Sequence, residues 1–238
     1  MLLVANGCSH TSGAEIEKHR NSECHEKAWP KHLADIWDCD HVNLSLCGGS
    51  NARVIRTTIE KIGELFNNNI HPKDIFVVIL WPGPYRTELY EKKYQDHPTW
   101  KSWVPLVVGN DYTGDRSLNA QKYYKAWVTL YDSAWADTQN YIEVLSLQSY
   151  LKSWGINYFF YRASTTHLLS TNSFNSFEIQ IDKKRFPGFK EKGKSYCEML
   201  EYKGFKYAPY SKFGHYGQDG HIFFAKFLDW NVKKIYDL

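Results

Sequence analysis

The stretch Met1-Leu-Leu-Val-Ala-Asn-Gly-Cys-Ser-His-Thr-Ser-Gly-Ala14 decides which fold this sequence predicts. Its apolar run, Met1 to Ala5, is too short to span a membrane and ends in small and hydroxyl residues, as a buried parallel strand does where it leaves a sheet. Ser9 would then lie beyond the carboxyl end of the first strand, at the edge where open α/β sheets bind ligands. A serine that only caps a helix is the simpler interpretation of this stretch alone.

Further apolar runs have the length and composition of strands, and helical patterns lie between them. Asp74 to Trp81 is continuous and rich in β-branched residues, which is typical of a central parallel strand buried on both faces. The other expected strands are His41 to Leu46 and Ile156 to Arg162, and the first expected helices are Ala28 to Trp37 and Asn51 to Phe66. The alternation predicts a three-layer α/β/α fold with a parallel, flavodoxin-like sheet.

The remaining segments are expected to decorate one domain that spans residues 1–238. The polar segment Glu15 to Lys27 predicts a loop over the sheet edge. Residues 82–118 form an expected insertion over the same edge, and residues 163–194 a long polar excursion. Asn119 to Trp154 is helical in pattern and long enough for two helices, and a last helix opens at His221 to Leu228.

Composition excludes several classes of protein. The chain has 238 residues and a net charge of +3, with Lys and Arg scattered along it, so we expect no nucleic-acid partner. Its five cysteines are odd in number and lack a C-x-x-C pair, which argues against a disulfide framework or a zinc knuckle. With no recognisable signal peptide and no membrane segment, the sequence favours a cytoplasmic location. The oligomeric state is left open.

Three fragments together resemble the SGNH, or GDSL-like, hydrolase superfamily. Gly7-Cys-Ser9 resembles its first block, although the usual Asp is Cys8 here. Asn43-Leu-Ser-Leu-Cys-Gly48 is similar to the second block, and Phe213-Gly-His215-Tyr-Gly-Gln-Asp-Gly-His221-Ile-Phe-Phe-Ala225 to the last. Each fragment is weak alone, but the three occur in the family's order, each at the end of an expected strand or the start of an expected helix.

The resemblance implies a serine esterase that needs no metal or other cofactor. Ser9 would be the nucleophile and His215 the base that takes its proton. The backbone N–H groups of Ser9 and Gly48 would form the oxyanion hole. Arg86 and Asn51 are candidate contacts for the substrate, an O-acyl ester of a small molecule or glycan, such as a carbohydrate acetyl ester. The other histidines show no metal-ligand spacing, so we expect them to be solvated or structural.

The chain departs from the family pattern in the third block. The family carries an Asn there as a second oxyanion donor, whereas this chain has Trp81-Pro-Gly-Pro84. Asn110, in Val107-Val-Gly-Asn110-Asp111, is an alternative donor outside the expected position. Arg86 could donate to a substrate oxygen instead, although an ion pair with Glu88 is the interpretation we favour.

The last block departs as well, because Lys212 or Phe213 stands where the family carries the Asp that orients the histidine. Either a Ser-His dyad operates with a carbonyl or a distant acid holding the ring, or the chain has lost activity. With one oxyanion donor and the usual acid both missing, we expect low activity. Asp219 and His221 offer an alternative acid and base, but His221 falls at the start of the expected last helix, where the family has a non-catalytic histidine. We therefore favour His215. An inactive relative that binds a glycan or a protein partner, and an O-acyltransferase, are the alternative functions.

Overall fold

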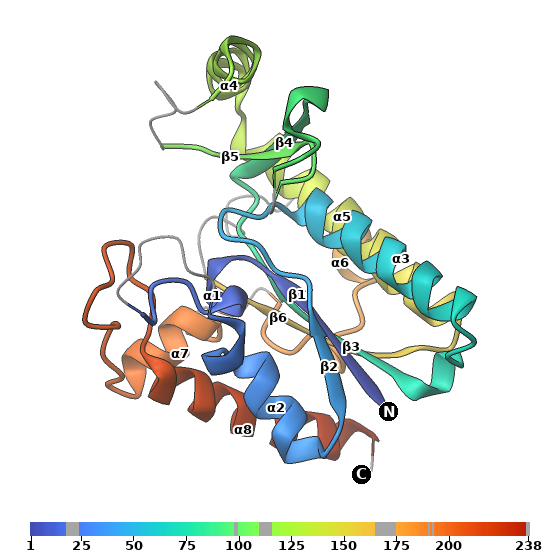
Figure 1. The fold of residues 1–238 in the computed structure, drawn as a ribbon. Helices are drawn as coiled ribbons and strands as arrows, with labels where there is room; N and C mark the ends of the chain where they lie inside the picture. Colours follow the sequence, from blue (N-terminus) through green and yellow to red (C-terminus); the bar gives the residue numbers. More distant parts are fainter. Residues whose placement is uncertain are drawn as a thin grey trace.

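In the computed structural model, residues 1–17, 24–97, 100–109, 116–164, 175–189, 191 and 193–236 are described. Four parallel strands form the central sheet in the order β2-β1-β3-β6. They are β1 (Leu2–Gly7), β2 (Asp40–Asn43), β3 (Ile75–Trp81) and β6 (Asn157–Arg162). Helices cover both faces of the sheet, which confirms the predicted three-layer α/β/α fold (Figure 1).

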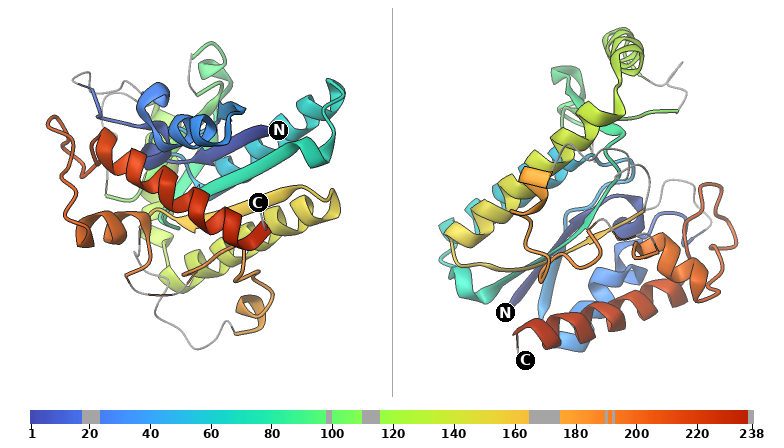
Figure 2. Two further views of the ribbon diagram at one scale, coloured as in Figure 1. Left: turned by 90° about the horizontal axis from the view of Figure 1, so that it is seen from below. Right: turned by 180° about the vertical axis from the view of Figure 1, so that it is seen from behind.

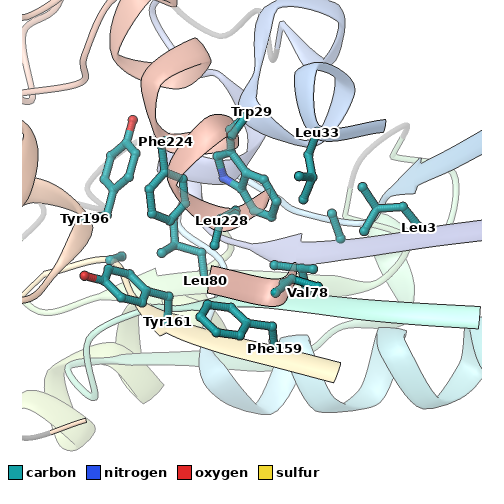
Figure 3. Close-up of a cluster of buried hydrophobic side chains, with 14 of the residues drawn as sticks. Leu3, Trp29, Leu33, Val78, Leu80, Phe159, Tyr161, Tyr196, Phe224 and Leu228 are labelled. Atoms are coloured by element: carbon teal, nitrogen blue, oxygen red, sulfur yellow. The ribbon is translucent and has the colours of Figure 1, made fainter. Parts of the chain in front are cut away.

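One face of the sheet is covered by helices from both ends of the chain. Figures 1 and 2 show α2 (Trp29–Trp37) and α8 (Gln218–Tyr236) side by side beneath the sheet, with α7 (Tyr196–Tyr202) near the start of α8. Phe224 and Leu228 of α8 meet Trp29 of α2 in a core that no water reaches (Figure 3). This core fixes the start of α8, and with it the loop that carries His215.

The other face is covered by α3 (Asn51–Asn67) and α5 (Ser133–Ser153). Ser50 caps α3 by accepting a hydrogen bond from the Arg53 N–H at 3.2 Å. Asn6 of β1 ties the sheet to α3, because its Nδ2 donates to the Val54 carbonyl and to the hydroxyls of Thr57 and Thr58 at 2.9 to 3.1 Å. A buried amide that is fully bonded in this way fixes where β1 ends.

The sequence predicted β3 closely, and every one of its residues is buried. The helical pattern after residue 119 is two helices, α4 (Leu118–Leu130) and α5, as its length had suggested. The last helix begins at Gln218, three residues earlier than expected, so Asp219 and His221 both lie in its first turn. The capping box of Ser195 and Glu198 starts α7, a helix that apolar spacing did not reveal.

The segment between β3 and α4 holds an antiparallel hairpin of β4 (Arg86–Tyr90) and β5 (Trp103–Val107). Figure 1 shows the hairpin and α4 projecting beyond the carboxyl ends of the parallel strands. Short elements complete the described chain: α1 (Ser9–Ser12), α6 (Asn175–Glu178), and the 3₁₀ turns His25–Lys27, Pro72–Asp74 and Lys92–Tyr94.

Candidate active site

Ser9 lies where the sequence placed it, directly after β1 at the carboxyl edge of the sheet. It is the first residue of α1, it is 6% exposed, and its Oγ makes no hydrogen bond to any described residue. Gly7 allows the tight turn into α1, because a Cβ there would lie 2.3 Å from Thr11 Oγ1 and 2.7 Å from the Leu80 carbonyl. A serine hydroxyl without an internal partner at this edge is available to a reactant.

His215 is held by a carboxylate from the other end of the chain. Its Nδ1–H donates to Glu15 Oε2 at 2.7 Å, and both side chains are buried. The same carboxylate oxygen accepts from Ser211 Oγ at 2.9 Å and from the backbone N–H groups of Lys212 and Phe213 at 3.2 and 3.3 Å. With Nδ1 bound to a carboxylate, Nε2 is the ring atom that can accept a proton.

A carboxylate from outside the last block therefore holds the His215 ring, which is the distant acid that the sequence left open as an alternative. Glu15 supplies it, although the family pattern has its acid in the last block. That pattern carries Asp at the position of Lys212 or Phe213. Here the backbone N–H groups of these two residues donate hydrogen bonds to the Glu15 carboxylate instead. Glu15 was assigned to a surface loop because it opens a polar segment, whereas its side chain is 4% exposed. Its partner lies 200 residues away in sequence, and no local pattern shows such a contact.

The Glu15 backbone carries a second sign of a fixed role. Its φ of 64° lies in the left-handed region, which costs a residue with a Cβ about 1–2 kcal/mol. Strain of this kind persists where the surrounding contacts hold it, and it gathers at functional sites. The four donors to Oε2 are such contacts. The turn at Glu15 thus aims the carboxylate at the loop of His215.

The electrostatics of the pair favour a neutral imidazole beside a charged carboxylate. Burial lowers the pKa of His215 from its ordinary value, and the Glu15 carboxylate offsets part of that shift. Burial by itself would raise the pKa of Glu15, but hydrogen bonds from His215, Ser211 and the Lys212 N–H outweigh it and lower the pKa. A neutral histidine near pH 7 can act as a general base.

His10, which the sequence left among the solvated or structural histidines, lies beside His215. It follows Ser9 directly, and its ring centroid is 5.0 Å from that of His215. No hydrogen bond joins Ser9 Oγ to either imidazole in the described structure, so the bond expected from the resemblance is not formed here. Burial, together with His215 and Arg86, lowers the pKa of His10 well below its usual range. The His10 imidazole is therefore neutral near pH 7, and it lies against His215.

The alternative base and acid have other partners. His221 is 1% exposed, and its Nδ1 accepts the backbone N–H of Trp29 at 3.2 Å, which joins α8 to α2. Burial, with smaller effects of His32 and His215, lowers its pKa to about 3. Asp219 lies in the first turn of α8, where its Oδ1 accepts the Gly220 N–H at 3.0 Å. Neither forms an acid–base pair with the other, and the geometry favours His215.

The second block faces the end of β1. A Cβ on Gly49 would lie 3.2 Å from the Gly7 carbonyl, so the two blocks touch. Gly48 has a φ of 78°, which glycine adopts without strain. Its N–H donates no hydrogen bond to a described residue, whereas the Gly49 N–H closes a turn onto the Leu46 carbonyl at 2.8 Å. The Gly48 N–H thus has no described acceptor, and its role as an oxyanion donor stays a prediction.

Arg86 is not paired with Glu88, and that prediction is wrong. Glu88 is bound at 3.1 Å through both carboxylate oxygens by Arg56 of α3. The Arg86 Nη1 instead donates to the Gly49 carbonyl at 3.4 Å. Apart from its contact with Tyr85, the guanidinium forms no other hydrogen bond to a described acceptor. Its charge lowers the pKa of both His10 and His215. Arg86 thus lies near His10 and His215 and has no carboxylate partner among the residues that the structure describes.

The two remaining candidates are placed differently. Asn51 is buried at the start of α3, and its Nδ2 donates to Asn140 Oδ1 of α5 at 2.7 Å. This bond gives Asn51 a role in packing α3 on α5, and a contact with substrate stays a prediction. Asn110, the alternative oxyanion donor, lies outside the described residues.

Among the described residues, no group of three or more His, Cys, Asp or Glu side chains could hold a metal ion. No described helix is long and apolar enough to cross a membrane. A cytoplasmic location stays a prediction.

One solved structure supports the fold. The psychrotrophic esterase EstA from a Pseudoalteromonas species, whose crystal structure was determined with monoethylphosphonate as inhibitor, superposes with a TM-score of 0.51 at 12% identity, over 100% of this chain and 99% of that chain. A carbohydrate esterase superposes with a TM-score of 0.45 at 12% identity, over 98% of this chain and 64% of its own. No curated protein sequence matches. A family model matches residues 13–236, and the chain belongs to the family of unknown function DUF6071.

Proposed function

We propose that this protein is a serine ester hydrolase of SGNH type that removes an O-acyl group from a small molecule or a glycan. Ser9 is the nucleophile, His215 the general base and Glu15 the carboxylate that orients it. The observation that carries the proposal is the 2.7 Å hydrogen bond between His215 Nδ1 and Glu15 Oε2. The His215 ring lies beside that of His10, the residue that follows Ser9. An imidazole fixed in this tautomer can activate a serine hydroxyl that comes within hydrogen-bond reach of its Nε2.

The oxyanion donors are the backbone N–H of Gly48 and the guanidinium of Arg86. Gly48 is supported by its free N–H, which lies in the block that touches the end of β1. Arg86 is supported by its position against the Gly49 carbonyl and by its effect on the pKa values of both histidines. A guanidinium can replace the family's absent Asn, because it donates N–H groups and adds a charge opposite to that of the oxyanion.

The reaction follows from these roles. Ser9 Oγ attacks the ester carbonyl as its proton passes to His215 Nε2, and Glu15 stabilises the imidazolium that results. The negative charge on the former carbonyl oxygen faces Gly48 and Arg86. His215 then protonates the alcohol as it leaves. Water, activated by the same imidazole, releases the acid and restores Ser9.

A fluorophosphonate probe tests the nucleophile directly. We expect the probe to modify Ser9 and no other serine, as mapped by peptide mass spectrometry. Ser12→Ala is the matched control for Ser9→Ala, because Ser12 is a buried hydroxyl of the same short helix whose Oγ only donates to the Ser9 carbonyl at 3.3 Å. Ser12→Ala should retain labelling and Ser9→Ala should lose it.

Turnover of a short-chain p-nitrophenyl ester is the companion measurement. Hydrolysis that Ser9→Ala abolishes supports the esterase. A protein that folds but shows neither labelling nor turnover would leave the glycan-binding or partner-binding alternative. Acyl transfer predicts a different outcome, in which added sugar acceptors divert the acyl group from the free acid.

A further inference from the structure

The carboxyl edge of the sheet carries a second arginine, which the proposed chemistry does not use. Arg162 is the last residue of β6 and is 3% exposed. Its Nη2 donates to the Glu191 carbonyl at 2.8 Å, whereas Nε and Nη1 are buried and meet no acceptor among the described residues. A guanidinium removed from water with two of its three nitrogens unbonded is costly, since buried charges in proteins are normally paired.

The surroundings of Arg162 contain no acid that binds it. Arg162 lines a cavity of about 10 Å³ with Trp81, Gly83, Asn140 and Ser164, and no Asp or Glu is among the lining residues. Glu191 and Glu198 are near enough to affect its pKa, but neither carboxylate bonds to the guanidinium, and burial lowers the pKa from its ordinary value. The sequence after Ser164, residues 165–174, contains no acidic residue. The positive charge therefore has no carboxylate bonded to it among the described residues.

We propose that Arg162 and Asn140 form a subsite that binds an oxygen of an anionic group, a carboxylate or a phosphate, on the ligand of this protein. A cavity of about 10 Å³ has room for one water-sized group, so it takes one oxygen of such an anion while the rest remains outside. The Asn140 amide can add a hydrogen bond. A neutral partner such as water could satisfy the N–H groups but would leave the charge unbalanced.

The subsite lies on the same edge of the sheet as Ser9. β1 and β6 are the two neighbours of β3, and Gly7 and Arg162 pair with the adjacent residues Leu80 and Trp81. Two strand spacings therefore separate them, about 10 Å across the sheet. Taken with the proposed function, on which this step rests, the spacing predicts a substrate whose anionic group lies on the order of 10 Å from the ester.

Thermal unfolding of the whole chain tests the subsite without requiring enzyme activity. Sodium formate and sodium phosphate are the two probes, each compared with sodium chloride at equal ionic strength. We expect at least one of them to raise the unfolding midpoint of the wild type by about 2–4 °C, because a ligand that binds only the folded state stabilises it. The probe that acts distinguishes a carboxylate ligand from a phosphate ligand.

The variants are Arg162→Gln and, as its control, Lys226→Gln, which removes the same charge from an exposed position on α8. Arg162→Gln should abolish the shift and Lys226→Gln should keep it. Without anion, Arg162→Gln should melt no lower than wild type, because it removes an unbalanced buried charge. If Arg162→Gln does not fold, Arg162→Lys retains the charge but not the guanidinium donors, and it should lose most of the shift.

A wild type that neither anion stabilises, or equal shifts in Arg162→Gln and Lys226→Gln, would overturn the subsite whatever the enzyme activity. If the shift depends on Arg162 but Ser9 is neither labelled nor catalytic, the subsite stands and the esterase fails. If both stand, an ester that carries a carboxylate or phosphate should have a higher kcat/KM than its neutral analogue, and Arg162→Gln should remove that preference.

Discussion

The two halves of the candidate active site differ in how fully their polar groups are used. Around Glu15 and His215, four donors converge on one carboxylate oxygen, and the His215 backbone N–H also binds Ser211 Oγ at 2.7 Å. Around Gly48 and Arg86, one N–H is free and Arg86 Nε is buried without a described acceptor. The first half forms its hydrogen bonds to Glu15 Oε2 without a substrate, although Glu15 Oε1 is buried without a described partner. The second half leaves the Gly48 N–H and Arg86 Nε without a described acceptor.

This difference predicts that the half around Glu15 and His215 stabilises the fold, whereas the half around Gly48 and Arg86 forms its hydrogen bonds only during the reaction. Bonds made in the resting protein stabilise the fold, while donors that meet their acceptor only in the transition state add nothing to it. Mutations in the two halves should therefore both reduce turnover but change the free energy of unfolding in different ways. The predictions below use esterase activity, circular dichroism and thermal unfolding.

The largest expected effect is that of the base. His215→Ala should reduce kcat by about 10⁴-fold or more, because both the proton acceptor and the acid for the leaving alcohol are lost. His221→Ala is the matched control, since it removes an equally buried imidazole whose Nδ1 binds only the Trp29 N–H. It should lower the free energy of unfolding by about 1–3 kcal/mol and leave kcat of the folded protein nearly unchanged. The reverse pattern would make Asp219 and His221 the acid and base.

Glu15→Gln tests the half of the site around Glu15 and His215. Loss of the carboxylate should reduce kcat by about 10²–10⁴-fold, because the imidazole loses both its orientation and its counter-charge. The free energy of unfolding should also fall, by roughly 1.5–3 kcal/mol, because hydrogen bonds to a charged group are replaced. Denaturant unfolding and kinetics on the same preparation check both effects. A variant as stable and as active as wild type would remove Glu15 from the site.

Arg86→Met tests the half with free donors. We expect kcat to fall by about 10²–10³-fold with little change in KM, because the lost contact forms in the transition state. Unfolding should need as much free energy as in wild type, or more. Arg56→Met is the control: Arg56 binds Glu88 and lies over the Trp103 ring at 4.2 Å, so its loss should weaken the hairpin more than the chemistry. A fall in stability without loss of kcat at Arg86 would make this arginine structural.

The smallest effect is a shift in the pH dependence. Activity requires neutral His215, and burial lowers the pKa of that histidine below 6.5, so turnover should rise with pH along a limb centred below pH 6.5. Glu15 opposes the lowering, and Glu15→Gln should therefore move the residual limb to still lower pH. The pKa of Glu15 is itself lowered, so its contribution to stability is present above its unfolded pKa and is lost as the pH falls through the folded one. A limb above pH 6.5 would contradict these assignments.

The contact of Glu15 with His215 also changes the level of esterase activity that we expect. Low activity was expected because both an acid and an oxyanion donor were missing from the sequence pattern. The acid is present, and Arg86 is a candidate for the donor. An activity in the range of ordinary esterases is compatible with this site.

The sequence by itself determined the strands and helices and the position of Ser9. Hydrophobic periodicity is local, so β3 and α3 could be read from the pattern of apolar residues, and the carboxyl edge of a parallel sheet then follows for residues that end a strand. Gly48 and His215 became candidates through the resemblance of their fragments to family blocks, and their roles stay predictions.

Only the tertiary structure decided which polar groups meet. The contacts of Glu15 with His215, of Arg56 with Glu88 and of Asn51 with Asn140 join residues that lie 200, 32 and 89 positions apart. These contacts depend on how α3, α5, the hairpin and the loop before α8 are placed around the sheet. Side-chain hydrogen bonds do not recur at a regular spacing along the sequence, so no sequence pattern predicts them. The acid, the role of Arg86 and the isolated charge of Arg162 therefore became visible only in the folded chain.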